Sequence, residues 1–220
     1  MEDKCKSAIL GRIRDALGVE ATPGDERERL RKEDWAQIPR RFRRNGTIAI
    51  EERISLFRAI LKHYGAASYT TSNADLVRSL ATVLQERKKK RMVVPDEFPA
   101  EWIPGDIEVV RDAGLTNEML DKIEGVLTGC TVAIASTGTI VLASGHDGRR
   151  ALTLVPDYQI CVVRGEQIVE FMAEGLEFLQ SLKTCPLTFF SGPSATVDIE
   201  MTRVQGVHGP RTLDVVIISS

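Results

Sequence analysis

Apolar residues recur at helical spacing in several stretches of the chain. The apolar positions from residue 50 to residue 61 predict a helix that Gly65 ends. Asn73 is a good N-cap for a second helix, which carries the apolar residues Leu76, Val77, Leu80, Val83 and Leu84. The cations of residues 87–91 would complement the dipole at its carboxyl end. Two further helices are predicted over residues 117–126 and 166–182.

Short apolar runs alternate with these helices and are typical of buried strands. They cover residues 67–70, 92–95, 107–110, 131–135, 139–143, 158–163, 188–190 and 213–218. This alternation predicts an α/β fold, with a mainly parallel sheet and helices on both faces. The tight turn Ser136-Thr137-Gly138 predicts an antiparallel hairpin, which we expect to join that sheet.

The first 45 residues differ from the rest and predict a helical or irregular arm before one domain over residues 46–220. Residues 7–17 have a helical stripe, and Gly18 follows it as a stop signal. The basic run at residues 40–44 suits a phosphate or an acidic partner, but a solvated linker is the more common fate of such a run. Trp35 and Phe42 are isolated aromatics on a charged segment, which hints at a homodimer that covers them.

Composition narrows the class of protein. The 220 residues carry a formal net charge of −2, so no overall field draws the protein to nucleic acid. No apolar stretch reaches the roughly 18 residues of a membrane span, and the first six residues lack the apolar core of a secretory signal. We therefore expect a cytoplasmic protein.

The cysteines and histidines give no metal-ligand spacing. The four cysteines are Cys5, Cys130, Cys161 and Cys185; they lie far apart and form no CxxC pair. Iron–sulfur and structural zinc sites usually take two ligands from one turn, so neither is expected in this chain, and no cofactor is evident. Cys130 and Cys161 fall in apolar runs, where cysteine is typically a small core residue.

Two glycine turns in the middle of the chain are candidates for ligand binding. Thr137, Gly138 and Thr139 offer hydroxyls and backbone amides to an anion, although a plain hairpin turn would look the same. The loop of residues 144–150 ends in Arg149 and Arg150, whose guanidinium groups suit carboxylate or phosphate. A surface loop without a ligand has a similar composition.

A third turn follows the strand at residues 188–190 and contains Ser191, Gly192, Pro193 and Ser194. Loops at the carboxyl ends of strands are the usual ligand position in open α/β sheets. A short helix from residue 194 to residue 199 would direct its amides at an anion. Asp198 and Glu200 are candidate catalytic acids or bases, or ion-pair partners of Arg203 or Arg211.

His208 lies in a fourth turn, Gly206-Val207-His208-Gly209-Pro210-Arg211, and is the remaining catalytic candidate. Its titration near neutral pH suits proton transfer, and Gly209 beside it is a candidate for ligand contact. A structural donor is the more common role of a lone histidine. The chain holds no phosphate-loop, dinucleotide, zinc-protease or nucleophile-elbow motif.

These turns resemble a known family. Residues 129–142 and 150–157 look like the core signature of the lactate utilization protein C family (LUD domain), and so do residues 191–200 and 206–211. The opening at residues 9–18 is also similar to family members. Many relatives have an acidic residue where this chain has Ser136, which removes support for any role that needs a carboxylate at this turn.

The resemblance implies a fold similar to the group of sugar-phosphate isomerases, CoA-transferases and formyltetrahydrofolate cyclo-ligases. It also implies a component of a multi-protein system that oxidises L-lactate to pyruvate, in which partner proteins carry the iron–sulfur motifs. One hypothesis is an accessory subunit that binds a small anionic ligand. A second is a stand-alone transferase or ligase for a phosphorylated or nucleotide-like metabolite, and a third is a scaffold with purely architectural turns. Whether the chain is itself an enzyme stays open.

Overall fold

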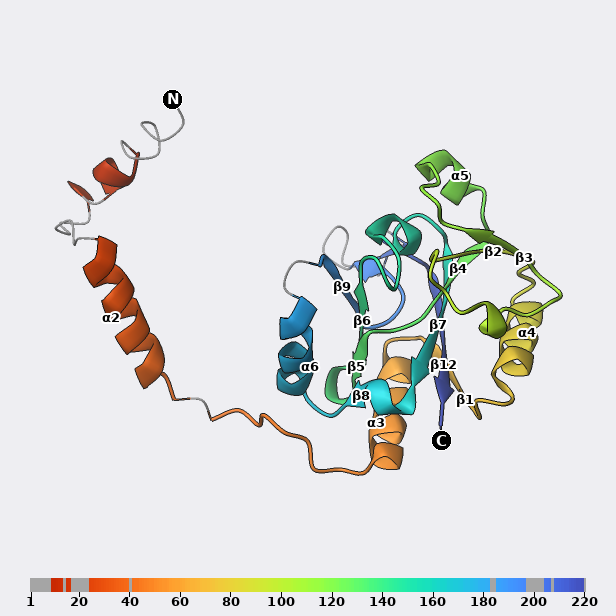
Figure 1. Cartoon of the computed structure of the whole chain (residues 1–220), viewed down its shortest axis with the longest axis horizontal. Helices are drawn as coiled ribbons and strands as arrows, with labels where there is room; N and C mark the ends of the chain where they lie inside the picture. Colours follow the sequence, from red (N-terminus) through yellow and green to blue (C-terminus); the bar gives the residue numbers. More distant parts are fainter. Residues whose placement is uncertain are drawn as a thin grey trace. The chain divides into compact units, whose positions relative to one another are not determined.

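The structure is a computed structural model that describes residues 9–13, 15–16, 24–39, 41–182, 185–196, 204–206 and 208–219. Contacts divide the chain into two compact units, Met1–Phe42 and Arg43–Ser220. In the first unit, residues 9–13 and 15–16 are helical and α2 spans Gly24–Gln37, within the segment that the sequence predicts to be a helical or irregular arm. The two larger sheets, of six and four strands, lie in the second unit (Figure 1).

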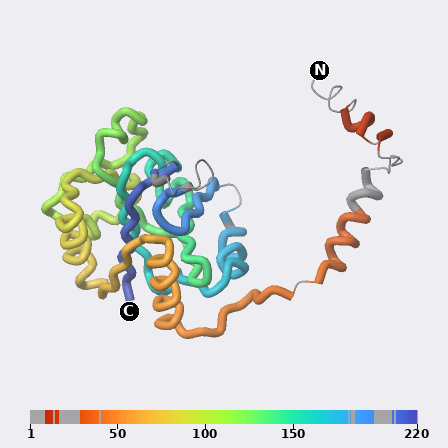
Figure 2. Tube along the Cα trace, turned by 180° about the vertical axis from the view of Figure 1, so that it is seen from behind, coloured from red at the N-terminus to blue at the C-terminus, as the bar shows by residue number. Residues whose placement is uncertain are grey.

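The main sheet of the second unit has six parallel strands in the order β1-β12-β7-β4-β2-β3. Their bounds are β1 Ala67–Thr71, β2 Arg91–Val94, β3 Glu108–Arg111, β4 Gly125–Thr128, β7 Tyr158–Arg164 and β12 Thr212–Ile218. The last strand of the chain, β12, therefore lies inside the sheet, between β1 and β7 (Figure 2).

Helices cover both faces of this sheet, as the sequence predicts. Helix α3, Ile50–His63, buries Phe57 and Leu61 in a core with Val215 of β12. Helix α4, Leu76–Glu86, buries its apolar stripe in a core with Val216, the next residue along β12. Because consecutive strand residues point to opposite faces, the two helices lie on opposite sides of the sheet.

A second sheet holds the predicted hairpin, which was expected to join the main sheet. The four strands run in the order β8-β5-β6-β9, and their bounds are β5 Val132–Ile134, β6 Thr139–Ala143, β8 Ile168–Val169 and β9 Leu187–Phe190. Ala133 and Ile140 on one face share the core of α3, whereas Val132 and Val141 on the other face pack near α6, Met172–Leu179. Helix α3 thus lies between the two sheets.

Other elements correct details of the sequence prediction. The helix expected over residues 117–126 ends early: α5 spans Asn117–Asp121, and β4 follows it. The residues expected to begin a helix at 166 instead form a 3-10 turn and β8. The N-cap of α4 is Asp75 and not Asn73. The 3-10 helices are Ala100–Trp102, Ala135–Thr137, Arg150–Thr153, Gly165–Gln167 and Gln180–Leu182.

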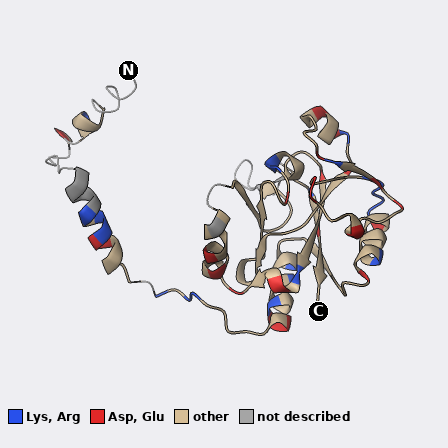
Figure 3. Ribbon diagram, in the orientation of Figure 1, with Lys and Arg blue, Asp and Glu red and all other residues tan. Residues whose placement is uncertain are grey.

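Charged residues of both signs are distributed over the helices and loops, whereas most strand residues are uncharged (Figure 3). No helix within the described ranges is long and apolar enough to cross a membrane.

Candidate ligand site

Two of the predicted turns meet through a chain of hydroxyl groups. The Oγ1 atoms of Thr137 and Thr139 lie 2.7 Å apart, and Oγ1 of Thr139 lies 2.8 Å from Oγ of Ser191. The register of the second sheet explains this contact, because β6 pairs antiparallel with β9 and Ile140 lies opposite Phe190. Thr139, which precedes Ile140 in β6, and Ser191, which follows Phe190 of β9, are therefore neighbours.

The third and fourth turns are also held together. Ser194 donates its amide to the Pro210 carbonyl at 2.9 Å, and its carbonyl accepts from the Gly206 amide at 2.8 Å. Its Oγ accepts a hydrogen bond from the His208 amide at 3.0 Å. The helix expected from residue 194 is not formed, since Ala195–Thr196 is β10, which pairs antiparallel with β11, Val204–Gln205. Ser194 thus joins the two turns as a structural link.

A cavity of about 120 Å³ opens between these turns and is the candidate ligand site. We call it the loop cavity. Gly192, Ser194, His208 and Gly209 of the predicted turns line it, together with Arg150. Six residues that were not among the site candidates complete the lining: Thr153, Gln159, Phe189, Phe190, Pro210 and Leu213.

The described lining of the loop cavity favours an anion. Among the lining residues, Arg150 carries a permanent positive charge. Its Nη1 donates a hydrogen bond to Thr153 Oγ1 at 3.0 Å, which orients the guanidinium group. Gln159 is 2% exposed and donates through Nε2 to Thr128 Oγ1 at 3.2 Å. A guanidinium, an amide and a hydroxyl that line one cavity are suitable groups to bind carboxylate or phosphate oxygens.

The sequence contains a signal that could have identified Gln159 as a site residue. It is a polar residue inside the apolar run of β7, and a buried polar side chain needs partners. Thr153 carries no such signal, because its turn is ordinary in composition.

Four candidate residues, Arg149, Thr137, Gly138 and Thr139, make their contacts outside the loop cavity. The guanidinium of Arg149 donates to the Asp112 carboxylate at 2.7 and 3.0 Å and also to the Leu115 carbonyl. This ion pair directs Arg149 to a neighbouring loop, so we leave it out of the site. Gly138 has φ of +62°, and a Cβ there would lie 2.7 Å from Cγ2 of Ile60. The Thr137–Thr139 turn therefore packs on α3 and does not line the loop cavity.

The predicted catalytic groups are only partly described. Asp198 and Glu200 lie outside the described residues. The side chain of His208 is exposed at the mouth of the loop cavity. Arg211 was an expected ion-pair partner of Asp198 or Glu200, and its Nε lies 3.3 Å from Oδ1 of Asp157. Pro193 and Ser191 lie in the same loop as Ser194 and are not among the residues that line the cavity.

The loop cavity lies at the amino edge of the main sheet. Gln159 and Leu213 stand at the beginnings of β7 and β12, and both line the cavity. The third turn does follow the carboxyl end of β9, as expected, but β9 belongs to the second sheet. The usual rule for open α/β sheets therefore does not explain this site.

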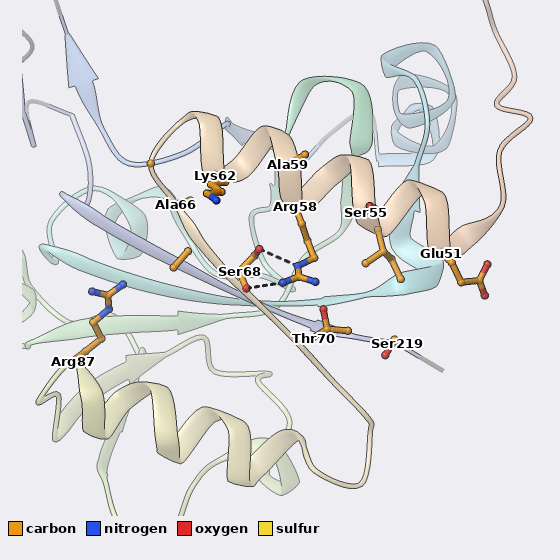
Figure 4. A pocket seen from close by; sticks show the side chains of 13 residues that line it. Glu51, Ser55, Arg58, Ala59, Lys62, Ala66, Ser68, Thr70, Arg87 and Ser219 are labelled. Atoms are coloured by element: carbon orange, nitrogen blue, oxygen red, sulfur yellow. Dashed lines mark hydrogen bonds between the residues drawn. The ribbon is translucent and has the colours of Figure 1, made fainter.

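An open groove of about 890 Å³ lies between α3 and the edge strand β1 (Figure 4). Arg58 reaches across it and donates to the Oγ and the carbonyl of Ser68, at 3.3 and 3.5 Å. Arg87 lines the groove too, but its guanidinium binds Asp214. Capping of an edge strand by a charged side chain hinders pairing with other chains, so we assign Arg58 an architectural role.

The buried thiols are poor nucleophiles. Burial raises the pKa of Cys130 well above its ordinary value, and burial raises the pKa of Cys161 to about 12. Both were expected to be core residues, and both are buried. Among the described residues, no group of three or more His, Cys, Asp or Glu side chains could hold a metal ion.

Comparisons with known proteins place the chain in a family. The model of the LUD domain matches residues 54–218. The Lactate utilization protein C of Deinococcus radiodurans is 47% identical over 159 residues, which cover 70% of this chain and 74% of that protein. The Lactate utilization protein C of Anoxybacillus flavithermus is 24% identical over 96% of this chain and 98% of its own length.

A solved structure agrees with the fold. The crystal structure of a DUF162 family protein from Deinococcus radiodurans superimposes with a TM-score of 0.68 at 38% identity, over 79% of this chain and all of that one. The family match covers both sheets and all the candidate turns. The chain therefore belongs to the LUD domain family.

Proposed function

We propose that this protein is a component of an L-lactate utilization system and binds a small anionic ligand in the loop cavity. In this proposal, iron–sulfur partner proteins oxidise L-lactate to pyruvate, and this chain acts as their ligand-binding accessory subunit. Membership in the LUD domain family and the names of the relatives support the role in lactate utilization. The core position of Cys130 and Cys161 is consistent with redox centres located on the partners.

The observation that carries the binding proposal is Arg150 in the wall of the loop cavity. It lines a space formed by three of the predicted turns, which Gln159 and Thr153 also line, and its guanidinium donates to the hydroxyl of Thr153. Polar groups that converge on a concave site beside apolar side chains are typical of small-molecule recognition. Phe189, Phe190 and Leu213 supply the apolar part.

The size of the loop cavity favours a small acid over a nucleotide. Its volume of about 120 Å³ equals the space of about four water molecules in the liquid, at roughly 30 Å³ each. Pockets for larger ligands usually hold about 300–1,000 Å³. A three-carbon acid is on the scale of this space, whereas the nucleotide-like substrate of the alternative transferase or ligase would extend far outside it.

Growth on L-lactate tests the role. A strain that lacks this gene and any paralogue should grow normally on glucose and fail on L-lactate, and the intact gene should restore growth. Arg150→Gln should fail to restore growth although the protein accumulates, whereas Arg91→Gln, at an exposed ion pair, should restore it fully. Normal growth of the deletion strain on L-lactate would overturn the proposed role.

Co-purification tests the partners. From cells grown on L-lactate, the tagged chain should carry proteins with the visible absorption of iron–sulfur clusters, and the chain expressed alone should be colourless. A complex that lacks iron, isolated under anaerobic conditions, would contradict the proposed partnership.

A further inference from the structure

A second cavity, of about 100 Å³, lies at the carboxyl edge of the main sheet. We call it the switch-point cavity. Pro99 lines it from the segment after β2, Gly129 and Cys130 from the segment after β4, and Arg164 from the end of β7. The loop cavity touches Gln159 at the beginning of β7. Arg164 lies five positions after Gln159 along the strand, or about 17 Å away, so the two cavities are separate sites.

The order in which the chain connects the strands of the main sheet makes this edge a typical position for a ligand. Strands β2 and β4 are neighbours, and the chain continues from β2 to β3 on one side. After β4, the next strand of this sheet along the chain is β7, which lies on the side of β4 opposite to β2. Neighbouring strands whose connections diverge leave a crevice outside their carboxyl ends, and this is where open α/β sheets bind ligands. The switch-point cavity lies in that crevice.

A buried carboxylate orients a histidine at this cavity. The side chain of Asp147 is 1% exposed, and its Oδ2 accepts hydrogen bonds from Thr131 Oγ1 and, at 3.0 Å, from the Ala143 amide. Its Oδ1 lies 3.0 Å from Nδ1 of His146, which is 75% exposed. Because a carboxylate accepts, the proton of the neutral imidazole is on Nδ1, and Nε2 offers a lone pair.

A cation is fixed at the same cavity. The guanidinium of Arg164 lies 5.0 Å from the ring centroid of Trp102, and both residues line the space. Gln167 braces this wall, since its Oε1 accepts from the Arg164 amide at 2.8 Å and its Nε2 donates to the Cys130 carbonyl. Stacking on an aromatic ring leaves the edge of a guanidinium directed for bidentate binding of a carboxylate.

We propose that the switch-point cavity is a second ligand site, specific for a small 2-hydroxy acid. Arg164 binds the carboxylate, and Nε2 of His146 accepts the hydrogen bond of the neighbouring hydroxyl. Glu97 and Asp147 also line the cavity, and their carboxylates repel a dianion more strongly than a ligand with a single negative charge, which is the kind that we propose. This site does not depend on the proposed role of the loop cavity.

The three histidines of the chain allow a direct test by proton NMR. His146 reports on the switch-point cavity, His208 on the loop cavity, and His63 on α3 serves as reference. Their ring resonances are assigned with His146→Gln and His208→Gln. The full chain is then titrated with L-lactate at about pH 8, where imidazole is ordinarily neutral.

The proposal predicts that the His146 resonances shift saturably while those of His63 do not. Propionate, which lacks the hydroxyl, should need at least a tenfold higher concentration for the same shift. Arg164→Gln should abolish the shift of His146, Arg164→Lys should weaken it, and Arg150→Gln should leave it unchanged.

A stationary His146 resonance would overturn the second site, and so would an equal response to propionate or in Arg164→Gln. A shift of His208 alone would overturn it while supporting the loop cavity. A shift of His146 alone would support the second site and count against the loop cavity as a lactate site. The His63 resonance and the melting temperature of each variant show whether it is folded.

Discussion

At the scale of residues, a buried carboxylate on β12 links the main sheet to α4. Asp214 is fully buried and accepts two hydrogen bonds of 2.7 Å from Arg87 and one of 2.9 Å from the Tyr158 hydroxyl. Burial and the Asp214 charge raise the pKa of Tyr158, so its hydroxyl stays protonated and donates. The cation at the end of α4 was expected to complement the helix dipole, and the structure shows instead that it neutralises this carboxylate.

Arg87→Met should lower the free energy of unfolding by about 3 kcal/mol, because it leaves the Asp214 carboxylate buried without its cation. This value is at the low end of the range for broken buried ion pairs, since water still reaches part of the Arg87 side chain. The control is Arg91→Met, which breaks an exposed pair with Glu108 and should cost less than about 1 kcal/mol. Urea unfolding measures both. Equal effects of the two substitutions would contradict the assigned role of Asp214.

A second carboxylate predicts a dependence on pH. Burial alone would raise the pKa of Asp112, but hydrogen bonds from Arg149 and from the Leu115 amide outweigh burial and lower this pKa below its ordinary value near 3.8. A lowered pKa stabilises the fold above the unfolded-state value, and this stabilisation is lost as the pH falls through the folded-state value.

Asp112→Asn should therefore weaken the fold at pH 7 and narrow the gap in stability between pH 7 and acidic pH below about 4. Urea midpoints at several pH values measure this gap. A variant whose stability falls with pH as steeply as that of the parent chain would show that Asp112 does not contribute.

At the scale of elements, the turn between β5 and β6 is fitted to α3. Gly138 adopts a left-handed conformation, and a Cβ there would meet Ile60 of α3 at 2.7 Å. The turn with Thr137 and Thr139 therefore holds the second sheet against α3, while its hydroxyls reach Ser191.

Gly138→Ala should lower the free energy of unfolding by about 1–3 kcal/mol, from the left-handed backbone and the close contact together. Ile60→Ala in the same chain should relieve the contact, so the double variant should be more stable than the sum of the single effects predicts. Thermal unfolding of the four chains measures this coupling. Strict additivity would show that the two residues do not meet.

The sequence pattern predicts most helices and strands because the buried residues follow the period of each element. The prediction fails where pairing between strands that are distant in sequence determines the local structure. Leu120, Ile123 and Val126 have helical spacing, yet Gly125 begins β4, which pairs with β2 and β7. At Gly125 a Cβ would lie 2.6 Å from the Tyr158 ring, so this strand position needs glycine. No local pattern contains that contact.

The same limit applies to the candidate site. The turns with Ser194 and Gly209 were found from their glycines and hydroxyls. Gln159 and Thr153 reach the loop cavity only because β7 and a 3-10 turn are folded against those loops. Arg149 and Arg150 are adjacent and alike in sequence, and only the position of Asp112 tells them apart.

At the scale of the whole molecule, the arm suggests an assembly. Trp35 is 66% exposed and Phe42 is 58% exposed in the first unit. Large exposed aromatics on a charged segment are typical of contact surfaces. We expect the full chain to be a homodimer, and Trp35→Ala together with Phe42→Ala to shift it toward monomer. Light scattering over a range of concentrations measures this, and a monomeric parent chain would contradict the expectation.

The central claim is that the loop cavity binds a small carboxylate, and a thermal-shift measurement of the full chain tests it most directly. L-lactate, pyruvate, CoA, nucleotides and sugar phosphates would be compared on the parent chain, Arg150→Gln and Arg164→Gln. A ligand at 100 times its Kd adds about 2.7 kcal/mol to the folded state, which raises Tm by roughly 5–10 °C in a chain of this size.

We predict a rise in Tm with L-lactate or pyruvate that Arg150→Gln reduces and Arg164→Gln does not abolish. No rise with any compound, or a rise of the same size in Arg150→Gln, would contradict it.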